Sequence, residues 1–308
     1  MSGDLFSPAA AGADFAERAV SPRRELGAYE ALWAPEGESL ESVAERFRIH
    51  EGARPSDFVP NGEIDAYARL ALAAIREARI ERFGLRVQGA GDYPRKLRDA
   101  DPPAELLYFE GAWELATSRC VAVVGTREPS DVGKKCASEI ARRLAGDGFT
   151  VVSGLARGID TVAHTAAMAA GGFTIAVLGT PITACYPPEN RALQRRIAGE
   201  HLVVSQVPIV RYSRTDLRRR GRFFPLRNAT IAALSEAAVI VEAGDVSGAL
   251  NLARRALEQR RKVFILDECI RNSALRWPHT LLQRGAIRVL GYDDIERHLS
   301  SADSAALS

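Results

Sequence analysis

The pattern of hydrophobic positions changes near residue 119. Between Glu25 and about Phe83, apolar residues recur at spacings of three and four, which is the period of an amphipathic helix. From Arg119 onward they form short β-branched runs, namely CVAVVGT, FTVVSGLA, FTIAVLGT, HLVVSQV, AAVIVEAG and KVFILDE. Helix-like segments separate most of these runs, among them VGKKCASEIARRLAGDG, DTVAHTAAMAAGG, RALQRRIAGE and SGALNLARRALEQR. The sequence therefore predicts helices first, and then strands that alternate with helices.

Strands that are apolar at nearly every position and alternate with helices are typical of a parallel sheet covered on both faces. Crossovers between parallel strands are right-handed. We therefore predict an α/β fold, a doubly wound Rossmann-like parallel sheet preceded by a small all-helical domain. The predicted division is a flexible tail (1–24), the small helical domain (25–90), a proline-rich connector (91–118), the Rossmann-like domain (119–299) and a second tail (300–308).

Composition narrows the class of protein. The 308 residues carry a net charge of +2, so any attraction to nucleic acid must come from a local patch. The four cysteines are scattered and form no CxxC pair, which favours reduced thiols and leaves no metal site, and we expect no cofactor. The N-terminus has no basic segment before an apolar run, and no run of about 18 apolar residues exists. We expect a cytoplasmic protein that does not enter a membrane.

Candidate ligand contacts follow the predicted strands, because ligands bind outside the carboxyl ends of the strands in such a sheet. The first apolar run is followed by GTREPSDVG and the second by SGLARGIDTVAH. Both loops precede helices, whose free N–H groups attract anions. The same spacings also fit ordinary strand-to-helix turns, the second one capped by Asp160. The candidate contacts in these two loops are Gly125, Arg127, Ser130, Ser153, Gly154, Arg157 and Gly158.

The sequence offers few candidates for catalytic residues. Ser247 and Gly248 open another helix after the fifth apolar run, and Glu242 ends that run. One carboxylate without a partner is poor evidence for general acid–base catalysis. His164 lies about one turn into a predicted helix, where a packing role is the more common one. We therefore predict no catalytic residue.

A basic stretch precedes the fifth apolar run. Between Arg211 and Asn228 the sequence RYSRTDLRRRGRFFPLRN contains seven arginines and one acidic residue. Proteins that bind single strands combine a positive groove for phosphates with an aromatic side chain on which bases stack. The alternative is a solvated basic loop with Phe223 and Phe224 folded into the core.

Taken together and in this order, the motifs resemble the DNA processing protein A family (DprA, also called Smf). The resemblance runs from about Asp92 to Ala286, includes CYPPEN among its segments and depends most on SGLARGIDTVAH, FPLRN and SGAL. It implies a Rossmann-like domain behind a helical one, and a homodimer that binds single-stranded DNA. It further implies loading of a RecA-type recombinase during natural transformation, without enzymatic activity.

The resemblance also implies a nucleic-acid-binding site. To the loop residues above it adds those of the FPLRN and SGAL motifs, and we include the end of the basic stretch, so that the further candidates are Arg222, Phe224, Arg227, Asn228, Ser247 and Gly248. The chain departs from the usual family pattern at Ala229, where an arginine is expected, and at Ala249, where a serine is expected. The cluster at 218–222 could replace the missing charge.

A second class of function stays open. A nucleotide-binding sensor, or a nucleoside-monophosphate phosphoribohydrolase of the same superfamily, would use a PGGxGT loop followed by a catalytic glutamate. The corresponding segment here reads EAGDVSGALNLA and lacks that run.

Overall fold

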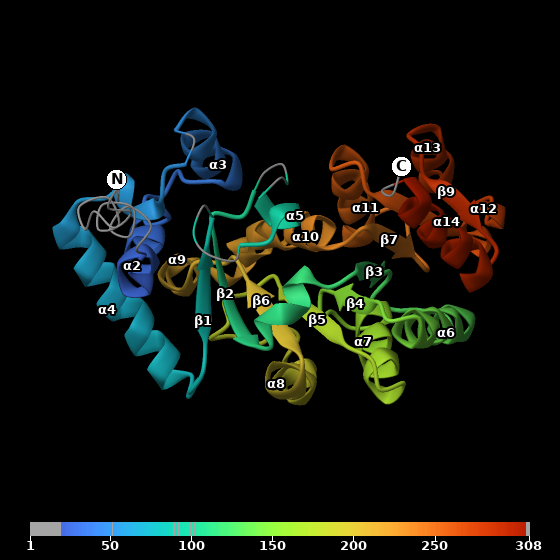
Figure 1. Ribbon diagram of the computed structural model, residues 1–308, viewed down its shortest axis with the longest axis horizontal. Coiled ribbons are helices and arrows are strands. Elements are labelled where there is room, and N and C mark those ends of the chain that lie inside the picture. Colours follow the sequence, from blue (N-terminus) through green and yellow to red (C-terminus); the bar gives the residue numbers. More distant parts are fainter. Residues whose placement is uncertain are drawn as a thin grey trace, which may run out of the picture.

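A computed structural model describes residues 20–50, 52–88, 90, 93–98, 100 and 103–305 of the chain. Within these residues nine strands form one sheet (Figure 1). In spatial order the strands are β1 (Gly84–Val87), β2 (Leu106–Gly111), β6 (Leu202–Ser205), β5 (Thr174–Leu178), β4 (Thr150–Ser153), β3 (Cys120–Val124), β7 (Ala237–Ile240), β8 (Lys262–Leu266) and β9 (Ile287–Val289).

All neighbouring pairs from β6 to β9 are parallel, whereas β1 pairs antiparallel with β2, and β2 with β6. The predicted doubly wound α/β fold is confirmed, and the six apolar runs form its central strands.

Helices cover both faces of the sheet, which explains why the strands are apolar throughout. Along β3, Val121 and Val123 face one core, while Ala122 and Val124 face the other. The first face is covered by α6 (Asp131–Gly146), α7 (Ile159–Ala169), α8 (Arg191–Glu200) and α14 (Tyr292–Ala305). The opposite face is covered by α5 (Arg95–Arg98), α10 (Phe224–Leu234), α11 (Gly248–Glu258) and α13 (Trp277–Gln283). In Figure 1, α6, α7 and α8 lie below the sheet and α10 and α11 above it.

The structure differs from the sequence-based expectations at β1, at β2, at β9 and at both ends of the described chain. The strand β1 lies in the segment expected to be wholly helical, and β2 lies in the expected connector. The reason is tertiary, because both are short strands that complete the sheet by pairing beside β6. At the chain ends, α2 (Pro22–Leu32) begins inside the expected first tail, and α14 runs on to Ala305. Residues 1–19 and 306–308 lie outside the described residues, and the division into domains stays a prediction.

Of the N-terminal helices α2, α3 (Leu40–Ile49) and α4 (Asn61–Glu77), α2 is tied to the sheet through a buried acid. Glu30 of α2 accepts hydrogen bonds from the backbone N–H groups of Ile209 (2.7 Å) and Val210 (2.8 Å). These two residues begin α9 (Ile209–Arg214). The hydroxyl of Tyr108 in β2 donates to the same carboxylate at 2.5 Å. A single side chain of α2 thus contacts both the sheet and the segment that leads into the basic stretch.

A second buried carboxyl group gives a testable pH dependence. Glu105 is fully buried, its Oε2 accepts a hydrogen bond from Gln206 Nε2 at 3.1 Å, and its Oε1 has no partner in the described part of the chain. Burial raises the pKa of Glu105 from 4.5 to about 7. The folded state therefore holds this proton more tightly than the unfolded state does. The free energy of unfolding should fall as the pH rises from about 4.5 to about 7.

Glu105→Gln removes the ionisable group and keeps its shape. Each unit of pKa shift corresponds to about 1.4 kcal/mol. We therefore expect the variant to be more stable than the parent protein at pH 8 and to differ little from it at pH 5. Urea titrations at the two pH values would measure this. An equal stability difference at both would show that Glu105 does not titrate on unfolding.

Candidate functional site

The candidate site lies at the carboxyl-terminal edge of the sheet, beside β3, where the order of the strands reverses. The chain winds from β3 through β4 and β5 to β6 on one side, and then returns to place β7 on the other side of β3. Loops diverge at such a reversal, and ligands of open α/β sheets bind there. A cavity of about 460 Å³ occupies this position, and we call it the switch pocket. Its lining includes Gly125, Thr126, Arg127, Ala156, Asp160, Arg227, Asn228, Ser247 and Gly248.

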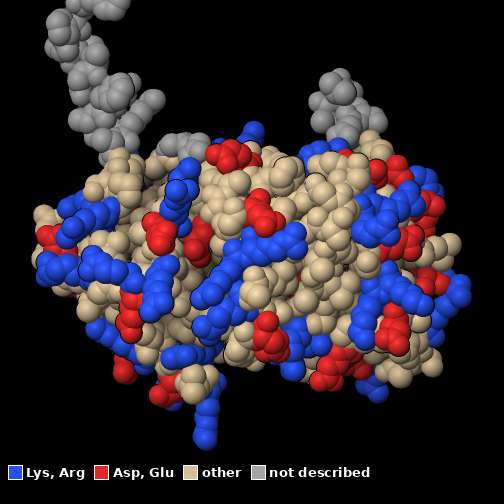
Figure 2. Space-filling model, turned by 90° about the horizontal axis from the view of Figure 1, so that it is seen from below, with Lys and Arg blue, Asp and Glu red and all other residues tan. Residues whose placement is uncertain are grey.

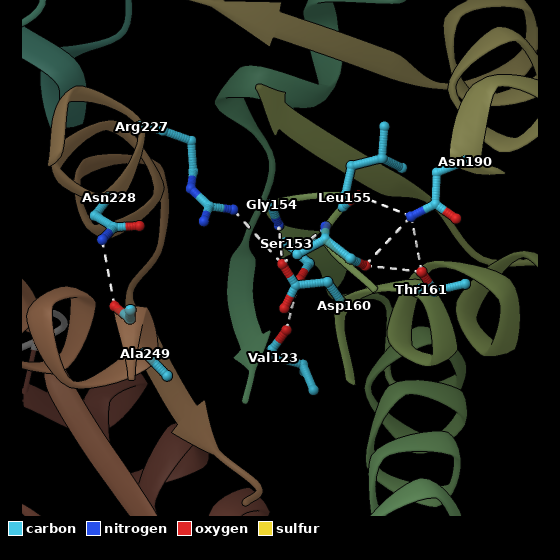
Figure 3. Close-up of polar contacts among 12 residues, drawn as sticks. Val123, Ser153, Gly154, Leu155, Asp160, Thr161, Asn190, Arg227, Asn228 and Ala249 are labelled. Atoms are coloured by element: carbon cyan, nitrogen blue, oxygen red, sulfur yellow. Dashed lines mark hydrogen bonds and ion pairs between the residues drawn. The ribbon is translucent and has the colours of Figure 1, made fainter. Parts of the chain in front are cut away.

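Arg227, in the first turn of α10, forms one wall of the switch pocket. Its Nη1 lies 3.5 Å from Oδ2 of Asp160, and its side chain is only 11 % exposed. The same carboxylate oxygen accepts hydrogen bonds from the N–H groups of Gly154 and Ala156, each at 3.2 Å (Figure 3). Burial lowers the pKa of Arg227, and Asp160 opposes that shift. Asp160 therefore fixes both the loop after β4 and the arginine above it.

Two glycines allow this close approach. A Cβ atom on Gly154 would overlap the guanidinium group of Arg227. Gly158 has a φ of +77°, and a Cβ there would overlap the backbone of Thr126 and Arg127. Because L-residues rarely adopt that φ, the loop after β4 can pack against the loop after β3 only with glycine at position 158.

An aromatic side chain lies among the arginines beside the switch pocket. Phe224 is half-buried, and the Cζ atoms of Arg127 and Arg227 each lie 5.8 Å from its ring centroid. The ring of Tyr186 is 6.2 Å away. Phe224, Tyr186 and Arg157 line a small hollow beside the switch pocket, and the Nε of the exposed Arg157 lies 3.6 Å from Glu189. An apolar ring flanked by cations suits a flat ligand that carries negative charge.

Other predicted residues hold the walls in place. The buried Asn228 donates from Nδ2 to the carbonyl of Gly248 at 3.3 Å and to Oδ1 of Asn251 at 3.0 Å, which ties α10 to α11. Ser247 caps α11 by accepting a hydrogen bond from the N–H of Ala249 at 3.3 Å. Gly125 lies at the carboxyl end of β3, where a Cβ atom would press on Glu242 and Ile159.

The structure places Ser130, Ser153 and Arg222 outside the lining of the switch pocket. Ser130 caps α6, but its hydroxyl donates to Glu242 at 2.8 Å, and its N–H also donates to that carboxylate. The positive end of α6 thus faces a carboxylate of the chain itself. Ser153 is fully buried and donates to the carbonyl of Val123 at 2.7 Å.

Two arginines of the basic stretch contact the loop between α2 and α3. Arg211 donates to the carbonyls of Ala34 (3.2 Å) and Glu36 (2.7 Å), and Arg222 donates to that of Glu38 (3.2 Å). The segment between them forms the short helix η4 (Leu217–Phe223). Arg211 and Arg222 therefore hold the basic stretch to the loop that follows α2.

Sequence reasoning treated some structural anchors too simply. The sequence predicts Asp160 as a helix cap, whereas in the structure it pairs with Arg227, and Gly158 is the residue that precedes α7. Asn190 donates to the carbonyls of Leu155 (2.9 Å) and Ala156 (3.3 Å), and so holds the glycine-rich loop (Figure 3). The CYPPEN motif that contains Asn190 was the available signal.

Other classes of site find little support within the described residues. His164 is fully buried, hydrogen-bonds through Nδ1 to Thr174 Oγ1 at 2.7 Å, and has its pKa lowered to about 3 by burial. No group of three or more His, Cys, Asp or Glu residues there could hold a metal ion, and the four cysteines are free thiols. None of the described helices is both long enough and apolar enough to span a membrane.

Comparison with known proteins identifies the family. The model of the DNA recombination-mediator protein A family matches residues 85–300. The chain belongs to this family. It is 33 % identical over 229 residues to DNA processing protein DprA of Bacillus subtilis, a match that covers 74 % of each chain. It is 43 % identical over 179 residues to protein Smf of Synechocystis, a match that covers 57 % of this chain but only 44 % of that protein.

Two solved structures of the family are similar to this one. DNA processing protein A from Streptococcus pneumoniae has a TM-score of 0.64 at 28 % identity, covering 92 % of this chain and 95 % of that one. The structure from Helicobacter pylori, which addresses the unique single-stranded DNA binding mode of that protein, has a TM-score of 0.60 at 26 % identity. It covers 72 % of this chain and 97 % of that one.

Proposed function

We propose that this protein binds single-stranded DNA at the switch pocket and delivers it to a RecA-type recombinase. The observation that carries the proposal is the half-buried ring of Phe224 between Arg127 and Arg227, at the edge where ligands of this fold bind. A stacked base and its neighbouring phosphates need that combination. A rigid duplex presents no free base face, so we expect it to bind more weakly than a single strand of equal length.

The relatives support the DNA part of the proposal. The similar Helicobacter pylori protein binds single-stranded DNA. The family is described as one of recombination mediators, which supports a role in handing DNA to a recombinase. The competing hydrolase function gains no support from Glu242, because that carboxylate is engaged by Ser130 at the start of α6.

Arg127→Ala tests the binding site. Arg127 is exposed and lines the switch pocket, so its loss should weaken binding of a single-stranded oligonucleotide while the melting temperature stays within about one degree of the parent value. Each lost phosphate contact should reduce the slope of log affinity against log salt concentration by about 0.7. Fluorescence anisotropy titrations at several salt concentrations would measure both quantities.

Arg142→Ala is the matched control, because Arg142 is exposed on α6 and does not line the switch pocket. It should change neither affinity nor slope. If the affinity of the parent protein for single-stranded DNA does not depend on salt concentration, an electrostatic site is ruled out. Release of free base from nucleoside monophosphates would instead favour the hydrolase function.

The partner part of the proposal has separate tests. We propose a homodimer, which could hold two stretches of one strand, and light scattering at micromolar concentration with and without DNA would measure its mass. Co-precipitation with RecA in the presence of single-stranded DNA tests the delivery step. A monomer under both conditions, or no association with RecA, would contradict these two parts and leave DNA binding unaffected.

A further inference from the structure

A second groove lies behind the loop that follows β5. It has a volume of about 510 Å³ and runs between this loop, α8 and the end of α4. Residues 182–185 of the loop line the groove, while Tyr186 and Pro187 of the same loop line the hollow beside Phe224. One short loop therefore separates the groove from the aromatic end of the proposed DNA site. We call this second groove the α8 groove.

Three arginines without counter-charges line the α8 groove. Arg191 and Arg195 lie one turn apart on the same side of α8, and Arg79 follows the end of α4. All three are exposed, and their side chains form no hydrogen bond or ion pair with any described residue. Their neighbour Arg196 differs, because its Nε lies 3.1 Å from the carboxylate of Glu200. Seen from below, several basic side chains lie over the region between α4 and α8, with acidic side chains among them (Figure 2).

The remaining lining of the groove offers little opposing charge. Glu110 is the one carboxylate among the described residues that line it, and burial raises the pKa of Glu110 to about 7. Near neutral pH a substantial fraction of this group is therefore uncharged. A cluster of cations with so weak a counter-charge attracts a polyanion.

A buried polar atom in the groove indicates what kind of polyanion fits. Gln194 lies between the two arginines of α8 in the sequence and is only 8 % exposed. Its Nε2 donates to the carbonyl of Ala184 at 3.3 Å, but its buried Oε1 has no hydrogen-bond partner in the described part of the chain. A buried acceptor without a partner is unfavourable. A DNA strand carries nucleobase N–H donors beside its phosphates, so it can offer this acceptor a partner.

We propose that a DNA strand leaving the switch pocket passes over Tyr186 and continues into the α8 groove, where Arg191, Arg195 and Arg79 contact its phosphates. This inference rests on the proposed function. Tyr186 is 50 % exposed between the two sites and offers a ring face to a base on the way. The bound strand would then be longer than the switch pocket alone can hold.

The experiment compares two lengths of oligo(dT) on the full-length protein. The double variant Arg191→Gln, Arg195→Gln should bind an oligonucleotide of about 20 nucleotides roughly tenfold more weakly than the parent protein does, with a salt slope smaller by about 1.4. An oligonucleotide of about 5 nucleotides fills only the switch pocket, so its affinity should not change. The single variant Arg79→Gln should show the same dependence on length.

Arg196→Gln is the control on the same helix, and it should bind both oligonucleotides like the parent protein. Because the two substituted arginines are exposed and form no ion pair with a described residue, melting temperatures should not change. Unaltered affinity of the double variant for the long oligonucleotide would overturn the groove proposal, and so would an equal loss at both lengths. If the parent protein binds neither oligonucleotide, the proposed function itself fails.

Discussion

Asp160→Ala is expected to lower the free energy of unfolding by about 3–5 kcal/mol, because it leaves a buried positive charge without its partner. Arg227 is held against this carboxylate with only 11 % of its side chain exposed. Asp160 also accepts hydrogen bonds from the N–H groups of Gly154 and Ala156, and these groups would lose their acceptor in the variant. Denaturation in urea, followed by circular dichroism, would measure the loss.

A double-mutant cycle separates the charge from the hydrogen bonds. Arg227→Met replaces the guanidinium with an apolar chain of similar length. It leaves the buried carboxylate of Asp160 with only the backbone N–H donors of Gly154 and Ala156, so we expect it to lose stability too, but less than Asp160→Ala does. The variant carrying both substitutions should be more stable than Asp160→Ala alone, because no buried charge is left unpaired. If the two losses simply add, the ion pair contributes nothing to stability. Arg227→Met should also bind single-stranded DNA poorly although it is folded.

The central fold could be predicted because its signal is local. Each of the six apolar runs becomes a strand with both faces covered, as β3 shows with its alternate residues in two different cores. The strands β1, β2 and β9 lie at or near the two edges of the sheet, and they were missed. Short strands of this kind depend on a neighbour for their hydrogen bonds, and a pattern within three to six residues does not reveal that neighbour.

The candidate site, like the fold, could be predicted from the sequence only in part. The position of the loops after β3 and β4 follows from the general geometry of parallel sheets, so Gly125, Arg127 and Gly154 could be placed at one edge. The pairing of Arg227 with Asp160 could not be predicted, because it joins α10 to α7 across 67 positions of sequence. The same holds for Glu242, which reaches the start of α6 only because β7 lies beside β3.

Adjacent phenylalanines should respond in opposite ways to truncation. Phe223 is only 2 % exposed and packs in the core beneath the N-terminal helices, near Leu26 and Tyr212. Phe223→Ala should therefore lower the free energy of unfolding by about 3–5 kcal/mol through the cavity that it leaves. Phe224 is half-buried over Gly179, where a Cβ atom would overlap its ring, and it lines the hollow beside the switch pocket. Phe224→Ala should mainly weaken DNA binding, by about 1–3 kcal/mol.

The salt dependence of DNA affinity distinguishes base stacking on Phe224 from ionic contacts to phosphates. Stacking on the ring of Phe224 does not involve counterion release, so the loss in Phe224→Ala should be the same at low and high salt. Phe224→Tyr keeps the ring face and should largely preserve affinity. Anisotropy titrations at two salt concentrations, with thermal melts of each variant, would decide the matter. If Phe224→Ala unfolds as readily as Phe223→Ala while its folded fraction binds DNA normally, Phe224 is a core residue and the stacking role is wrong.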